Sequence, residues 1–95
     1  MNSFSEEYPE LINLLSTLTK NEVMAIQDIV QELIIAKEKH PKWPKDWVHR
    51  AAIVQEEAGE LIRAALQHEY EDAMISDMEE EAIQTGAMAI RFLSE

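Results

Sequence analysis

The chain has 95 residues, which suits one domain, and its hydrophobic content of 46% predicts a packed fold and not a disordered segment. A net charge of −11 disfavours binding to a nucleic-acid polymer, and the lack of cysteine excludes disulfides, thiolate metal sites and thiol nucleophiles. The sequence has no apolar run of the ~20 residues that a membrane span needs and no secretory leader, so we expect a cytoplasmic protein without a membrane partner.

Two helices are predicted in the first part of the chain. Helix-forming residues dominate, with only two glycines and three prolines, and alternating β-branched runs are absent. We expect a short helix over residues 6–17 and a second helix over 22–39. Thr19 and Glu22 fit a capping box before the second helix, and Asn21 is a rival cap.

Two further helices are predicted in the second part. Pro41 and Pro44 stop the preceding helix, and apolar residues at steps of three and four predict a helix over residues 45–69. Ser76 and Glu79 fit a capping box at the start of a last helix. Four helices with short connections predict an all-α, four-helix-bundle-like domain over residues 1–95, completed by a second copy of the chain.

Carboxylates lie beside the predicted core on both of the last two helices. Glu57 and Glu60 are one turn apart, and Glu81 with Gln84 repeats this spacing. Mg²⁺ takes oxygen ligands, and facing helices can hold one ion between such pairs. Carboxylates at a helix interface are costly unless they are paired or bound to metal. On spacing alone, however, solvated glutamates are the commoner case.

The same stretch resembles a known family. Residues 56–60, Glu-Glu-Ala-Gly-Glu, are similar to the EExxE motif of the MazG-like nucleotide pyrophosphohydrolases, and residues 80–85 match the place of that family's ExxD motif. The layout of residues 43–93 is similar to the family core. The resemblance implies a MazG-type helical fold, a homodimer or homotetramer, and hydrolysis of nucleoside or deoxynucleoside triphosphates to monophosphate and pyrophosphate, a possible house-cleaning role in the nucleotide pool.

The resemblance also implies roles for single residues. The metal, Mg²⁺ or alternatively Mn²⁺, would lie on Glu57, Glu60, Glu81 and Gln84, with Glu56 as an accessory ligand or as the group that orients the attacking water. The candidates for binding the phosphates are Lys45, Arg50 and Arg91. The candidates for contacting the base are Trp43 and His49, for which a packing or surface role is the alternative.

One position departs from the family pattern. Gln84 stands where the family has aspartate, and a neutral amide weakens cation binding. Three outcomes stay open: weaker metal binding, a changed number of metal ions, or lost catalysis. We therefore carry two hypotheses, a triphosphate pyrophosphohydrolase and a catalytically impaired helical module that forms oligomers or binds nucleotides or proteins.

Overall fold

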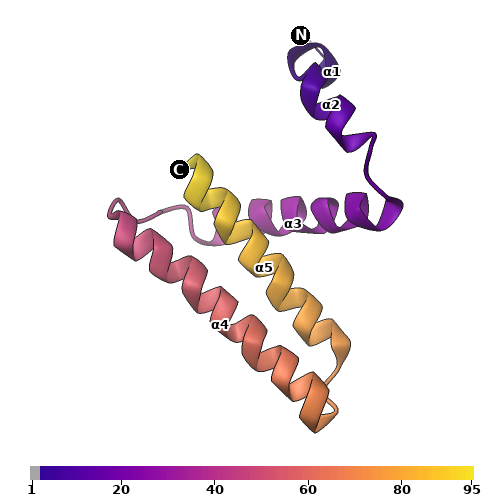
Figure 1. Ribbon diagram of the computed structural model, residues 1–95. Coiled ribbons are helices and arrows are strands. Elements are labelled where there is room, and N and C mark those ends of the chain that lie inside the picture. The colour runs from indigo at the N-terminus through magenta and orange to yellow at the C-terminus, as the bar shows by residue number, and fades with distance from the viewer. Residues whose placement is uncertain (1–2) are drawn as a thin grey trace.

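The computed structural model describes residues 3–95, so the first two residues of the predicted domain lie outside the described part. Among the described residues there are helices and no strands, which confirms the all-α, bundle-like class (Figure 1). None of these helices has the length and apolar character needed to cross a membrane. The helices are α1 (Phe4–Glu7), α2 (Pro9–Leu15), α3 (Lys20–Lys39), α4 (Trp47–Glu71) and α5 (Ile75–Ser94).

The packed part of the molecule consists of three helices. α4 and α5 form an antiparallel hairpin, and α3 crosses α5 (Figure 1). The apolar side chains that these contacts bury fully are small: among the described residues they are Ala36, Ala64 and Ala87. Gly86 of α5 lies at the α3 crossing, where a Cβ atom would approach the Ile29 side chain to 2.9 Å. Small residues thus allow the close approach of helices on which the candidate site depends.

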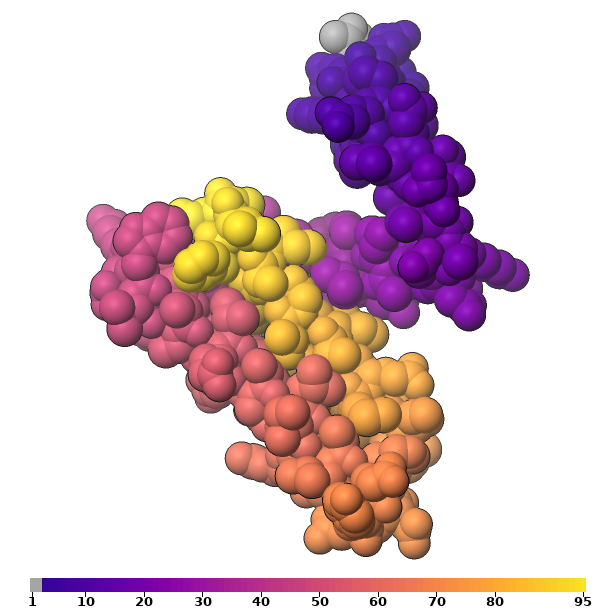
Figure 2. Space-filling model, viewed as in Figure 1, coloured from indigo at the N-terminus to yellow at the C-terminus, as the bar shows by residue number. Residues whose placement is uncertain are grey.

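The first predicted helix lies apart from these three. It is divided at Tyr8 into α1 and α2, because Pro9 starts a new helix at a position where its missing N–H costs no hydrogen bond. We call residues 3–18 the arm. The arm makes no extensive contact with α3, α4 or α5, and Figure 2 shows it projecting away from the rest of the chain.

Helix ends follow the predicted caps in one case and depart from them in another. The Thr19 hydroxyl accepts a hydrogen bond from the Glu22 N–H at 3.1 Å, and the Glu22 carboxylate accepts from the Thr19 N–H at 2.8 Å. The predicted box at Ser76 is wrong, because the N-cap of α5 is Met74, two residues earlier, and Met74 makes no side-chain cap bond. Asp72, the C-cap of α4, has a left-handed backbone, and only two residues separate it from the start of α5 at Ile75.

Candidate metal centre

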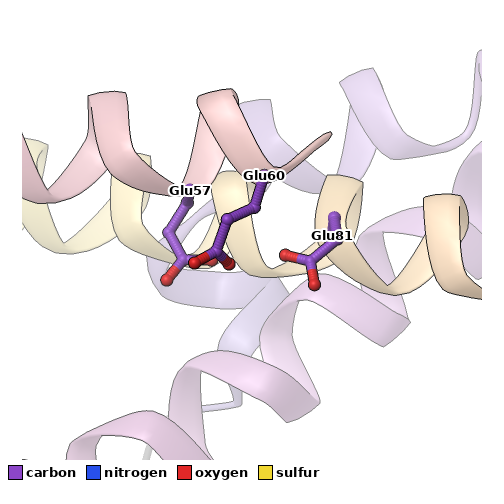
Figure 3. Close-up of side chains that lie close together, drawn as sticks. All are labelled: Glu57, Glu60 and Glu81. Atoms are coloured by element: carbon purple, nitrogen blue, oxygen red, sulfur yellow. The ribbon is translucent and has the colours of Figure 1, made fainter. Parts of the chain in front are cut away.

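Three glutamates from two helices converge at the α4–α5 interface. Helical periodicity places Glu57 and Glu60 one turn apart on α4, and α5 presents Glu81 opposite them (Figure 3). One carboxylate oxygen from each lies within 4.8 Å of the other two. All three side chains are half-buried. This cluster could hold a metal ion, as oxygen ligands of this kind suit a divalent cation.

Among the described residues no basic side chain forms a salt bridge with the cluster, and the nearby Arg63 lines the hollow beside Glu60 and Glu81. Burial raises the pKa of Glu57, and the nearby carboxylates of Glu60, Glu56 and Glu32 raise it further. Burial also raises the pKa of Glu81, and the neighbouring carboxylates raise it further, Glu60 first and then Glu57 and Glu80. Within residues 3–95 the one salt bridge, between Arg91 and Glu95, involves none of the three. The carboxylates therefore repel one another when all are ionised.

Two oxygens of the cluster lack any hydrogen-bond donor. Glu57 Oε2 and Glu81 Oε2 are shielded from solvent and unpartnered. A buried carboxylate oxygen without a donor is costly, and a bound cation would satisfy it. The possible metal ligands are all carboxylates, and two of their oxygens lack a hydrogen-bond partner. These residues therefore fit a hard divalent cation.

A cavity of ≈ 230 Å³ lies beside the cluster, between α3, α4 and α5. Glu57 and Gln84 contribute to its wall from α4 and α5, and Glu32 and Lys39 contribute from α3. Gln84 therefore lies near the carboxylates, one turn beyond Glu81, as its spacing predicts. A second hollow of ≈ 410 Å³ adjoins Glu60 and Glu81 on the other side. Space for a ligand thus exists next to the carboxylates.

Sequence reasoning missed the contribution of α3. Glu32 is half-buried and close enough to raise the pKa of Glu57, and Lys39 and His40 line the cavity of Glu57. The one available signal was that Glu32 precedes Ala36 by a turn on the inward side of the helix. The angle at which α3 crosses α5, which no local pattern encodes, brings these residues to the site.

Arg91, a predicted phosphate ligand, is committed to structural contacts. Only 2% of it is exposed. Its Nη1 donates to the His40 carbonyl at 3.0 Å and its Nε donates to Glu95 at 2.9 Å. The guanidinium lies 4.6 Å from the centre of the Trp43 ring. Arg91 and Trp43 therefore join the loop after α3 to the end of α5 by a cation–π contact and hydrogen bonds.

The other predicted ligand-binding residues also lie outside the two hollows. Arg50 donates from Nε to the Pro44 carbonyl and stacks on Trp47. Lys45 and His49 are exposed near the start of α4 and line neither hollow. Glu56 is exposed beside Glu57, whose pKa it helps to raise. The structure thus gathers the predicted metal ligands and leaves the predicted phosphate and base ligands apart from them.

Comparisons of the chain with protein-family models, with curated proteins and with solved structures find no significant match.

Proposed function

We propose that this protein is a Mg²⁺-dependent pyrophosphohydrolase of nucleoside or deoxynucleoside triphosphates, active as a cytoplasmic homodimer or homotetramer. The observation that carries the proposal is the convergence of Glu57, Glu60 and Glu81 without a basic partner. Mn²⁺ is an alternative ion for the same oxygen ligands. The resemblance of residues 56–60 to the MazG-like motif supplies the reaction, and the site geometry is compatible with it.

The reaction breaks the anhydride between the α and β phosphates. Water supplies the new oxygen on one phosphorus atom, the bridging oxygen leaves with the other, and the water protons pass to a base and to solvent. A bound divalent cation polarises phosphoryl oxygens and lowers the pKa of bound water. Glu57, Glu60 and Glu81 would hold that cation. Glu56 is exposed beside them and is the proposed group for orienting the water.

The cavity beside Glu57 supports a ligand that combines a cation with an anion. Its wall includes the carboxylates of Glu32 and Glu57 together with Lys39, which lies at the end of α3. The Lys39 ammonium would attract phosphate oxygens as a point charge. Lys39 therefore supplements the predicted phosphate ligands, of which Arg50 and Arg91 already have backbone partners.

The second hypothesis is a helical module that keeps the bundle and has lost catalysis. Gln84 favours it, because the amide removes one negative charge from the wall of the cavity. This hypothesis predicts no metal-dependent turnover. It also predicts that neutralising a cluster carboxylate simply relieves repulsion.

A pyrophosphate-release assay separates the two hypotheses. Purified protein is incubated with each common NTP and dNTP and with Mg²⁺ or Mn²⁺, beside Glu60→Gln and the control Glu79→Gln, whose side chain is exposed on α5 outside the cluster. Stoichiometric monophosphate and pyrophosphate, lost in Glu60→Gln and retained in the control, would support the enzyme. If the folded protein releases no pyrophosphate from any nucleotide, the helical binding module is the better supported hypothesis.

A further inference from the structure

Glu32 places a further carboxylate beside the cluster, and it comes from a different helix. It is half-buried on α3 and lines the same cavity of ≈ 230 Å³ as Glu57 of α4 and Gln84 of α5. Of the three cluster carboxylates, only Glu57 borders this cavity, and Glu32 is close enough to raise the pKa of Glu57. Glu32 therefore lies next to the cluster, on the same side as Gln84.

No basic side chain of the described residues forms a salt bridge with Glu32. Lys39 lines the same cavity but is not paired with Glu32. Two ionised carboxylates on different helices repel each other, and partial burial strengthens the repulsion because little water screens it. A divalent cation in the cavity would change the repulsion between Glu32 and Glu57 into a shared attraction to the ion.

On the basis of the cation-dependent function proposed above, we propose that Glu32 supplies the negative charge that Gln84 does not, so that the bound divalent cation joins α3 to α4. The amide of Gln84 offers the ion one neutral carbonyl oxygen. Glu32 borders the same cavity, so its carboxylate can hold the ion directly or through the water that Mg²⁺ retains. The ion is then held from three helices, because Glu81 belongs to α5.

The way in which α3 is attached gives this role a structural consequence. α3 packs on α5, where Ile29 lies against Gly86, and it makes no extensive contact with α4. Without a cation, repulsion between Glu32 and Glu57 opposes a closer approach of α3 to α4. Cation binding should therefore hold α3, and with it Lys39, at the wall of the cavity.

The first test measures binding of Mn²⁺ alone, without nucleotide, from the loss of the electron paramagnetic resonance signal of the free ion. Glu32→Gln, which keeps the size of the side chain, should weaken Mn²⁺ binding by about tenfold or more. The matched control is Glu38→Gln, which removes the same charge from an exposed position on α3 outside the cavity and should keep the native affinity. Adding Gln84→Glu to Glu32→Gln should restore binding, because it returns a carboxylate to the same cavity.

A second measurement follows α3 itself and needs no variant to succeed. Amide hydrogen exchange of the native chain should slow over α3 when Mg²⁺ is added, since opening of the helix away from α4 then costs more free energy. Glu32→Gln should show little of this slowing, and Glu38→Gln should show all of it. Circular dichroism establishes that each variant is folded before it is compared.

The outcomes separate this role of Glu32 from the proposed enzymatic function. Equal Mn²⁺ affinity of the native chain and Glu32→Gln, or exchange of α3 that Mg²⁺ leaves unchanged, would overturn the role of Glu32 and leave the enzyme standing. Binding that depends on Glu32 in a protein that releases no pyrophosphate would support the role and refute the enzyme. A folded native chain that binds neither Mn²⁺ nor Mg²⁺ would overturn both.

Discussion

Replacing Glu81 by glutamine should change stability with opposite sign in the absence and presence of metal. The substitution keeps the size of the side chain and removes its charge. Glu81 lies within 4.8 Å of carboxylate oxygens of both Glu57 and Glu60. Two unit charges at that separation repel by about 1 kcal/mol in water and about 3.5 kcal/mol at an effective dielectric constant of 20.

The stability that Glu81→Gln should gain is smaller than the summed repulsion energies of the Glu81–Glu57 and Glu81–Glu60 pairs. The side chains are half-buried, and the raised pKa of Glu57 and Glu81 shows that proton uptake relieves part of the repulsion. We expect metal-free Glu81→Gln to be more stable than the native chain by about 1–2 kcal/mol at neutral pH. With Mg²⁺ at a hundred times its dissociation constant, the native chain gains about 2.7 kcal/mol, most of which the variant loses.

The assay is urea unfolding followed by circular dichroism, at fixed protein concentration, with EDTA or with Mg²⁺. The control is Glu79→Gln on the same helix, which should change stability little in either condition because surface substitutions usually do. A Glu81→Gln variant that is less stable than native in EDTA, or that gains as much from Mg²⁺ as native does, would refute the argument that these carboxylates form an uncompensated cation site.

Two further predictions concern pH and helix packing. Folding raises the pKa of Glu57 and Glu81 above the ordinary value of 4.5, so the folded chain keeps protons that the unfolded chain has lost. The free energy of unfolding without metal should therefore fall as pH rises from 4.5 to the raised pKa values. Urea unfolding in EDTA across this pH interval tests the expectation, and a free energy of unfolding that rises with pH would contradict it. A Cβ atom at position 59 would have no neighbouring atom within 4 Å. Gly59→Ala should therefore stabilise the chain by about 1 kcal/mol, because alanine favours the helix more than glycine does. Gly86→Ala gains the same helix propensity, but its new methyl group crowds Ile29, and such overpacking costs about 1–3 kcal/mol. In the same assay the Gly86→Ala variant should therefore be less stable than Gly59→Ala by about 1–3 kcal/mol. Equal stabilities of the two variants would show that the α3–α5 contact is not tight.

The amino-acid sequence determined the helical class and the local layout of the carboxylates. Residue spacing at three and four placed Glu57 and Glu60 on one side of α4, and helical phase placed Glu81 and Gln84 one turn apart on α5. The cap at Thr19 followed from its own side chain and that of Glu22. These features were predictable because they depend on helix geometry and on neighbours within a few residues.

The tertiary structure alone decided what surrounds the carboxylates. The crossing of α3 over α5, close because Gly86 has no side chain, brings Glu32 and Lys39 to the cavity of Glu57. The burial of Arg91 under Trp43 depends on a contact between residues about fifty positions apart. Interhelical angles and long-range contacts result from how whole surfaces pack, and no pattern within a single helix specifies them.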